Sequence, residues 1–466
     1  MINLKNNSFN NNIDNSTNNT AKKNSNNLNS LVTSICYIAV GGVVYKALEY
    51  IYYKTFIYKI ETKRSKYFEL LKCSLYNNKI CIESNEYSLV TNVEYNKFIK
   101  AFKDFPIVKA WYIANINKVN FNTNNFLNLK INKPSTSILE YTCNTPIIKS
   151  NYLSNLTGLN VYIKLENLLP YTSKDRITKN IIFQAVLRGD ITKNTTLYEG
   201  SSGSTCYSVA MIGNILGLKS KLVIPDDLSE EKLNLLKSTG AELIITKQCP
   251  YSNFNDNYIR LAKKLASNDK NGFLVNQFEN EDNFKVHFYD TSEEILNFFY
   301  LDNYKYNINK LDAFVSGAGT GGTIAGISNR LKQFDSNIKV YLADVTGSGL
   351  YSYVKNNVVF TQEESEANRK KYRYYTKIEG IGINFLTSNF KRAIIDDAVK
   401  ITDDEAIDIA KKVYINDGLF AGGSSGVNFA AIVKLKDSLP RGSNVLTIMY
   451  DSGYKYLKKL YSNEVK

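Results

Sequence analysis

The sequence predicts an α/β protein built on mostly parallel sheets, because strand-like and helix-like segments alternate from about residue 135 onward. The strand-like segments are 161–166, 221–225, 241–246, 312–317 and 339–344. After the second of these, Ser229 is a suitable N-cap for a helix of apolar periodicity, and Gly240 fits the glycine that follows a helix end. Parallel strands need such crossover helices, so the alternation indicates repeated βαβ units.

The chain of 466 residues divides into four predicted parts. Residues 1–30 are rich in Asn and too poor in apolar residues to fold, so we expect a disordered tail. Residues 31–53 contain an uncharged apolar run, LVTSICYIAVGGVVY, with lysines on both sides and tyrosines near its end, which predicts a transmembrane anchor. A buried helix of the soluble domain is the alternative. Residues 54–134 form a juxtamembrane extension of unknown role, and 135–461 form the catalytic domain.

Composition argues against several classes of function. The net charge is +14, but the lysines are spread along the whole chain, which does not favour nucleic-acid binding. The six cysteines form no CxxC pair and the sequence has one histidine, His287, so we expect neither a Cys/His metal site nor a disulfide framework. No nucleophile elbow lies near His287, which disfavours a hydrolase triad.

A glycine-rich turn, Gly317–Thr323 (GAGTGGT), lies between a predicted strand and a helix. Backbone N–H groups at such a helix start can bind a phosphate. The pattern also satisfies GxGxxG, and Asp344 ends the next strand where a dinucleotide fold has its ribose-binding acid. Against a dinucleotide, at least three strands precede the turn, and Thr320 and Thr323 add donors suited to a terminal phosphate.

Three further loops precede apolar helices. The first holds Lys174 in the run Ser-Lys-Asp-Arg, which on its own is more often a solvated charge cluster than a site. The second, Glu199–Cys206 (EGSSGSTC), offers hydroxyls and small residues suited to a carboxylate, or is a polar linker. The third is Gly422–Gly426 (GGSSG). Loops at the carboxyl ends of parallel strands are where α/β enzymes place their chemistry.

Together with YIKLEN, TGAELIIT, NQFEN, IEGIG, ITDDEAI and DSG, these loops give the chain from Asn144 to Leu457 a recognisable order. It resembles the cysteine synthase/cystathionine β-synthase family of fold-type II enzymes that use pyridoxal 5′-phosphate (PLP). LADVTGSGLY, IEGIGIN and the N-terminal anchor most resemble the membrane-anchored fungal cysteine synthase-like branch. The resemblance implies two three-layer α/β/α subdomains with the active site between them.

The resemblance also implies roles for individual residues. Lys174 would hold PLP covalently and act as general base and acid at the substrate Cα. The remaining cofactor contacts would come from Ser204, Gly319, Thr320, Gly321, Gly322, Thr323 and Ser424, and the substrate carboxylate contacts from Ser202, Gly203, Thr205 and Gln277. Because a serine cannot hold a protonated pyridine nitrogen, Ser424 favours loss of a β-substituent over transamination.

The sequence departs from the family pattern in the carboxylate loop. Ser204 stands where the family has an Asn that contacts the PLP 3′-oxygen, and Cys206 replaces a glycine, adding a side chain where the backbone approaches closely. We expect that these changes bear on activity. The loop before Lys174 reads Leu169-Pro170-Tyr171 and lacks the usual glycines.

The resemblance implies a cysteine synthase of amino-acid biosynthesis that converts O-acetyl-L-serine and sulfide to L-cysteine and acetate. A serine/threonine deaminase, a cysteine desulfhydrase and a catalytically impaired scaffold at a membrane are the alternatives. It further implies a homodimer, and a location in the mitochondrial outer membrane, or another organelle membrane, with the catalytic domain facing the cytosol. We expect no nucleic-acid partner and no metal.

Overall fold

The computed structural model describes residues 100–109, 137–247, 257–301, 308, 310–359 and 376–461. The chain divides into two compact units, Met1–Leu89 and Val90–Lys466, and all described residues belong to the second. The predicted tail (1–30) and anchor (31–53) therefore lie outside the described residues, as does most of the extension 54–134. Among the helices that are described, none is long and apolar enough to cross a bilayer.

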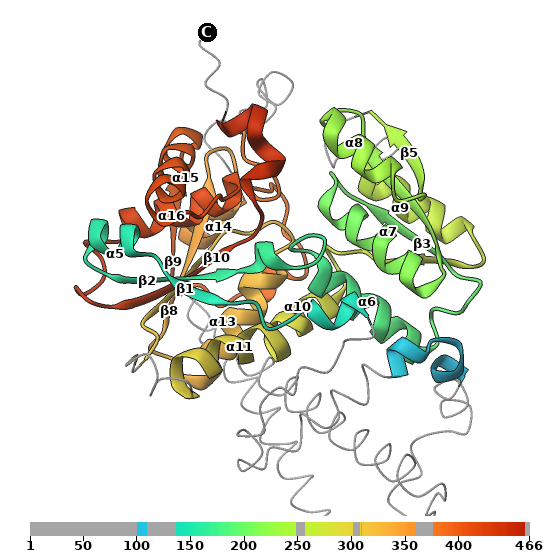
Figure 1. Cartoon of the computed structure of the whole chain (residues 1–466), viewed down its shortest axis with the longest axis horizontal. Coiled ribbons are helices and arrows are strands. Elements are labelled where there is room, and N and C mark those ends of the chain that lie inside the picture. Colours follow the sequence, from blue (N-terminus) through green and yellow to red (C-terminus); the bar gives the residue numbers. More distant parts are fainter. Residues whose placement is uncertain are drawn as a thin grey trace, which may run out of the picture. The chain divides into compact units, whose positions relative to one another are not determined.

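A six-stranded sheet organises the larger part of the second unit, with the order β1-β2-β10-β7-β8-β9 (Figure 1). Its strands are β1 (Ile147–Lys149), β2 (Asn160–Leu165), β7 (Ala313–Ser316), β8 (Lys339–Val345), β9 (Asp397–Ile401) and β10 (Asn444–Met449). Only the edge strand β1 is antiparallel to its neighbour in this sheet. The segments predicted around 161–166, 312–317 and 339–344 are confirmed as β2, β7 and β8.

Helices cover both faces of this sheet because its strands are apolar on both sides. In β2, Val161 and Ile163 pack into one core cluster, while Tyr162 between them packs into another, as the period of two requires. The first face carries α5 (Asn151–Thr157), α15 (Asp403–Asp417) and α16 (Gly423–Lys434). Helix α14 (Leu350–Asn356) contacts β8 and β9 and packs into the cluster on the second face. The second face carries α11 (Ser292–Leu296) and α13 (Gly322–Phe334).

A four-stranded parallel sheet, in the order β5-β4-β3-β6, forms the smaller part. Its strands are β3 (Thr196–Gly200), β4 (Lys219–Pro225), β5 (Glu242–Thr246) and β6 (Gly272–Leu274), and its helices are α6 (Asp175–Arg188), α7 (Ser204–Leu216), α8 (Glu230–Lys237) and α9 (Tyr258–Asn268). Leu222 and Ile224 of β4 pack into the core with α6 and α7, and α9 packs on β3, β4 and β6. The strands expected at 221–225 and 241–246 are confirmed, and Ser229 caps α8.

Short helical turns complete the described part of the chain. The 3₁₀ turns are η2 (Ile138–Tyr141), η3 (Glu166–Leu168), η6 (Phe390–Arg392) and η7 (Gly453–Tyr456). Helix α10 (Glu281–Val286) continues into the π-helical turn η4 (His287–Thr291), and two further π-helical turns are η5 (Asn297–Leu301) and η8 (Leu457–Tyr461). Residues 100–109 are largely helical, and Ala101, Phe105 and Val108 pack into the same core as α6 and α7.

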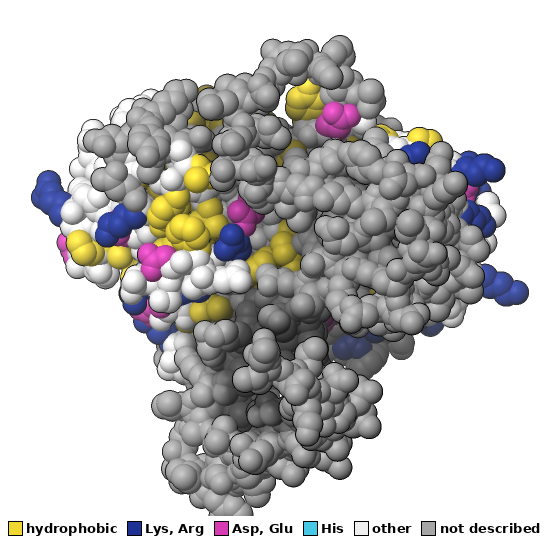
Figure 2. Space-filling view, turned by 90° about the horizontal axis from the view of Figure 1, so that it is seen from below, with side chains coloured by type: hydrophobic (Ala, Val, Ile, Leu, Met, Phe, Trp, Pro, Cys, Tyr) yellow, Lys and Arg dark blue, Asp and Glu magenta, His cyan; other side chains and the backbone are white. Residues whose placement is uncertain are grey.

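Charged side chains are mixed on the surface. On the face shown in Figure 2, the described Lys and Arg side chains lie apart from one another and are interspersed with acidic and apolar ones. This face therefore presents no continuous basic surface among the residues that the structure describes.

Candidate functional site

A pocket of about 250 Å³ lies between the two sheets. Loops at the carboxyl ends of the strands surround it, since the chain crosses there from β2 of the larger sheet to α6 of the smaller one. Most of the residues singled out in the sequence line it, namely Lys174, Ser202, Ser204, Thr205, Gln277, Gly319, Thr320, Gly321, Thr323 and Ser424. Gly203 and Gly322 do not line it, but they lie at the starts of α7 and α13.

Three helices that have a glycine as N-cap residue begin at this pocket without a side-chain cap. Their N-cap residues are Gly203 for α7, Gly321 for α13 and Gly422 for α16, and no side chain binds the first N–H groups. By contrast, Ser229 and Thr402 cap α8 and α15, which begin elsewhere. Uncapped N–H groups at a helix start attract anions, so the pocket offers more than one place for a negatively charged group.

Lys174 is the N-cap residue of α6 and lines the pocket. The turn that presents it is held by Asp175, whose carboxylate accepts hydrogen bonds from the backbone N–H groups of Tyr171 (2.7 Å) and Thr172 (3.1 Å). Lys174 Nζ lies 5.8 Å from the centre of the Tyr450 ring. Burial lowers the pKa of Lys174, against an opposing effect of Asp451. A larger share of this amine is therefore neutral than for an exposed lysine.

The glycine-rich turn before α13 packs closely on a second loop. A Cβ on Gly319 would lie 2.2 Å from the Gly380 carbonyl oxygen, and Gly321 has a φ of +83°. Both positions therefore require glycine. The turn is also fixed by side chains: Asn283 donates to Thr320 Oγ1 (3.0 Å), and Thr323 Oγ1 lies 3.1 Å from His287 Nε2.

The opposite side of the pocket is formed by the loop before α7 and by Gln277. Thr205 Oγ1, in α7, donates to Gln277 Oε1, after β6, at 2.7 Å, which brings together two of the predicted carboxylate ligands from different segments. Both side chains are buried, while Ser202 is exposed at the mouth. Gly203 has a φ of +135°, a conformation that few other residues adopt.

Ser424 enters the pocket from the first turn of α16. The neighbouring Ser425 Oγ accepts from the Tyr450 backbone N–H at 3.0 Å and so ties α16 to the end of β10. Asp451, the next residue, accepts from Tyr456 Oη at 2.5 Å, and burial raises the pKa of this carboxyl.

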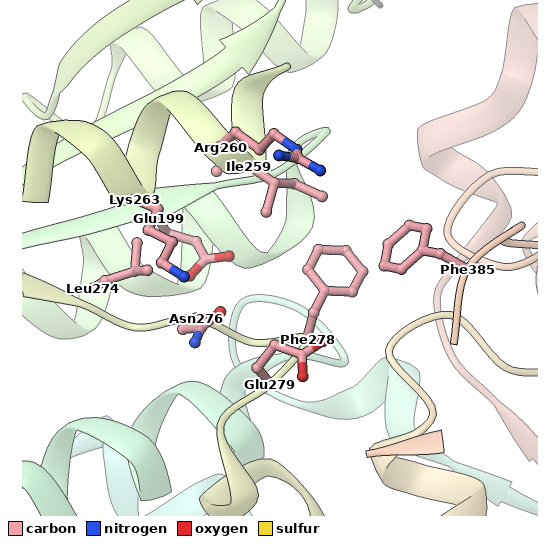
Figure 3. A pocket seen from close by; sticks show the side chains of 10 residues that line it. Glu199, Ile259, Arg260, Lys263, Leu274, Asn276, Phe278, Glu279 and Phe385 are labelled. Atoms are coloured by element: carbon pink, nitrogen blue, oxygen red, sulfur yellow. The ribbon is translucent and has the colours of Figure 1, made fainter. Parts of the chain in front are cut away.

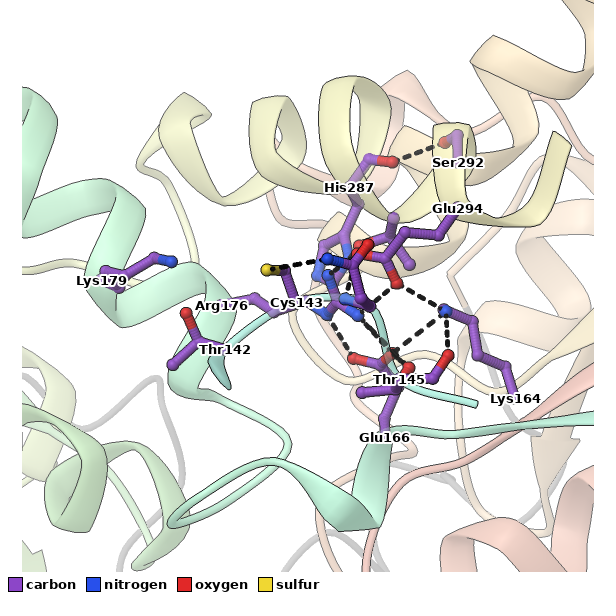
Figure 4. A network of polar contacts seen from close by, with 12 residues as sticks. Thr142, Cys143, Thr145, Lys164, Glu166, Arg176, Lys179, His287, Ser292 and Glu294 are labelled. Atoms are coloured by element: carbon purple, nitrogen blue, oxygen red, sulfur yellow. Dashed lines mark hydrogen bonds and ion pairs between the residues drawn. The ribbon is translucent and has the colours of Figure 1, made fainter. Parts of the chain in front are cut away.

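A buried ionic network supports the start of α6 (Figure 4). Arg176 is fully buried and donates to Glu166 (2.6 and 2.8 Å) and to Glu294 (2.6 and 2.8 Å). Lys164 donates to Glu294 at 2.6 Å, and Thr145 Oγ1 donates to Glu166 at 2.6 Å. The network thus connects η3, α11 and β2 to Arg176, which lies two residues after Lys174. It therefore restrains the helix that begins at this lysine.

The model of the family described as "Pyridoxal-phosphate dependent enzyme" matches residues 138–451. The chain belongs to this family. It is 40% identical to the "Putative mitochondrial cysteine synthase" of Saccharomyces cerevisiae, over 71% of this chain and 85% of that protein. It is 38% identical to the cysteine synthase of Dictyostelium discoideum, over 70% of this chain and 84% of that protein. The crystal structure of the O-acetylserine dependent cystathionine β-synthase of Helicobacter pylori is 30% identical, with a TM-score of 0.60, and matches 71% of this chain and all of that one.

Asp344 lies near the end of strand β8, which agrees with the structural role that the resemblance to this PLP-dependent family implied. Its Oδ2 accepts from the Tyr351 backbone N–H at the start of α14 (2.7 Å), and it is not among the residues that line the described pocket. Asp344 is therefore not placed to bind the ribose of a dinucleotide, as the alternative of a dinucleotide site required. Cys206 is fully buried in the core of the smaller sheet, with Sγ donating to the Ser201 carbonyl at 3.7 Å. Its side chain therefore does not narrow the pocket of this PLP-dependent enzyme.

Several residues that no sequence pattern marked as site residues also line the pocket. These are His287, Asn283, Tyr450, Asp451, Lys232 and Glu379. His287 was predicted to take part in neither a metal site nor a hydrolase triad, and the structure places it behind the glycine-rich turn. Lys232 and Glu379 form an ion pair across the pocket although they are 147 residues apart, and no local pattern marks such a pair.

Proposed function

We propose that this chain catalyses β-replacement on an O-activated L-serine and is a cysteine synthase. The reaction is O-acetyl-L-serine plus hydrogen sulfide giving L-cysteine plus acetate. The observation that carries the proposal is the convergence of the half-buried Lys174 and three helix N-termini without side-chain caps on one pocket. Relatives of this chain carry the name cysteine synthase, which supports this substrate class.

The residues present fit PLP. The start of α13 suits the phosphate, because Gly319 to Thr323 offer backbone N–H groups and two hydroxyls where a side chain at Gly319 would clash. Lys174 would bind the aldehyde carbon of the cofactor through Nζ. Ser204 would contact the cofactor on the side of its 3′-oxygen. Ser424 would face the pyridine nitrogen from the first turn of α16. When bound, PLP supplies the electron sink that stabilises negative charge at the substrate Cα.

The roles of the protein groups follow from their positions. Lys174 Nζ, whose pKa is lowered by desolvation, would take the proton from the substrate Cα and later return it. Ser202, Gly203, Thr205 and Gln277 would hold the α-carboxylate at the start of α7. A hydroxyl at residue 424 accepts and donates but carries no charge, so it favours loss of the β-substituent, here acetate, with sulfide taking its place.

A spectroscopic experiment tests the proposal. The full-length protein should show the visible absorbance band of lysine-bound PLP, and O-acetyl-L-serine should convert it to a band at longer wavelength. Sulfide should restore the first band with formation of cysteine. Lys174→Ala should lose the band, while Lys455→Ala, an exposed neighbour, should keep it. Absence of the band, or its persistence in Lys174→Ala, would exclude the assignment. Pyruvate and ammonia as the main products would favour a deaminase or desulfhydrase.

We also propose a mitochondrial location, with residues 31–53 as an outer-membrane anchor and the catalytic domain facing the cytosol. The name of the yeast relative supports the organelle, and the uncharged apolar run supports the anchor. After cell fractionation, the protein should stay in the mitochondrial pellet on carbonate extraction and should be digested by protease added to intact mitochondria. Release into the supernatant would exclude the anchor.

A homodimer is proposed from the family resemblance and is tested by light scattering.

A further inference from the structure

A second, smaller cavity of about 70 Å³ lies behind the carboxylate side of the main pocket (Figure 3). Glu199, Asn276 and Phe278 line it, and Phe278 lines the main pocket as well. Gln277 faces the main pocket between Asn276 and Phe278. In Figure 3 the rings of Phe278 and Phe385 approach each other from different segments, with centroids 5.8 Å apart. The residues that would hold the substrate carboxylate therefore have a cavity directly behind them.

Glu199, in β3, is the acidic residue buried at the inner end of this cavity. It is 2% exposed, and its Oε2 has no hydrogen-bond partner. Burial raises the pKa of Glu199 to about 8, although hydrogen bonds from the backbone of Asn276 and from the backbone and side chain of Gln277 lower it. At neutral pH the group is therefore mostly a neutral carboxylic acid, and it lies beside the Gln277 amide.

The Gln277 side chain is consequently held at both ends. An amide has one oxygen and one NH₂ group. Its oxygen accepts from Thr205 (2.7 Å), which leaves its NH₂ group to interact with Glu199. The backbone is fixed too, because the Gln277 carbonyl oxygen accepts from Asn283 (2.8 Å) and Asn389 (3.1 Å). Thr205 and Glu199 together thus decide which way the amide faces.

We infer that Glu199 is a positioning residue for the substrate carboxylate, acting through Gln277 and Thr205. This inference rests on the proposed function, since it assigns the carboxylate of the O-activated serine to these two side chains. A neutral acid suits the position because a second negative charge behind the carboxylate site would repel the substrate. Glu199 itself faces the rear cavity, so it acts without touching the substrate.

Two substitutions test this inference in the PLP-bound full-length enzyme. Glu199→Leu removes the hydrogen-bonding group, and we expect KM for O-acetyl-L-serine to rise about tenfold with kcat nearly unchanged. Glu199→Gln keeps an oxygen acceptor of the same shape and should restore KM to within about threefold of the wild type. Glu242→Leu, an exposed change on β5, is the matched control and should leave KM unchanged. An unchanged KM in Glu199→Leu, or a fall in kcat alone, would overturn the inference.

A pH series gives a second test that does not need the leucine variant to fold. Above about pH 8, ionised Glu199 should raise the wild-type KM for the donor, whereas Glu199→Gln should lack this rise. The charged and titratable groups near Glu199 are Arg260 and Lys263 on α9, Glu279 after β6 and Cys206 on α7. These groups are the same in both enzymes, so a difference between the two pH profiles of KM is caused by the ionisation of Glu199. Identical pH profiles would contradict the inference, whereas a wild type without PLP or turnover would refute the proposed function itself.

Discussion

Replacing Glu294 by glutamine should destabilise the protein by about 3 kcal/mol, because this side chain neutralises two buried cations. Its carboxylate accepts from Lys164 and Arg176 at 2.6 Å each, and both cations are fully buried. After the substitution, Glu166 would remain as the acidic partner of both within this network. The NH₂ group of the glutamine would also face the donors of Lys164 or Arg176, and an NH₂ group cannot accept their hydrogen bonds.

The magnitude follows from the pKa of Glu294. Burial alone would raise this pKa, but Arg176 and Lys164 lower it from its ordinary 4.5 to about 2. At about 1.4 kcal/mol per pKa unit, the folded protein favours the ionised form by about 3 kcal/mol. Because the folded pKa is depressed, this contribution is complete above about pH 4.5 and disappears as the pH falls toward 2.

Urea unfolding at pH 7, followed by circular dichroism, measures the effect on the holoenzyme. Glu293→Gln is the matched control, since Glu293 lies on the same helix and pairs with Arg330 at the partly exposed surface. We expect it to cost less than about 1 kcal/mol. Equal losses in the two variants, or a loss below about 1 kcal/mol for Glu294→Gln, would refute the reasoning.

Three further predictions concern the pocket. Gly319→Ala places a Cβ 2.2 Å from the Gly380 carbonyl oxygen. PLP affinity should therefore fall about ten- to a hundredfold in a titration of the apoenzyme. An unchanged affinity would show that this turn does not bind the phosphate. Glu379→Gln breaks the partly exposed pair with Lys232 and should change the unfolding free energy by less than about 1 kcal/mol, so a larger loss in urea unfolding would contradict the surface character of this pair. Burial lowers the pKa of His287 to about 3, so the unfolded chain takes up a proton below about pH 6.5 that the folded one does not. Stability should therefore decrease as the pH falls from 6.5, by up to about 1.4 kcal/mol per unit, and urea midpoints of His287→Gln should show a weaker decrease.

Much of the fold could be predicted from local sequence patterns. Apolar runs marked β2, β4, β5, β7 and β8 to within about two residues, and Ser229 marked the start of α8. Gly240 was expected directly after that helix; it does have a φ of +75°, but Ser238 is the C-cap residue. Such features are local because a strand period or a cap depends on residues only a few positions apart.

The sequence by itself also determined where chemistry would gather. Three loops follow strands and precede helices, and Gly422–Gly426 precedes a further helix. Parallel strands bring their carboxyl ends to one edge, and the family resemblance implied that Lys174, Thr205, Thr320 and Ser424 meet in one site. What it could not determine was the environment of each group. Cys206 was expected to crowd the site, but the orientation of α7 places it in the core.

Only the tertiary structure decided which distant residues act on that site. Glu294 lies 118 residues from Arg176, and Glu379 lies 147 residues from Lys232. Glu199 stood in a predicted loop with no separate role until packing placed it behind Gln277. The physical reason is that burial and charge pairing depend on how two sheets and their helices pack, and no pattern within one segment records that arrangement.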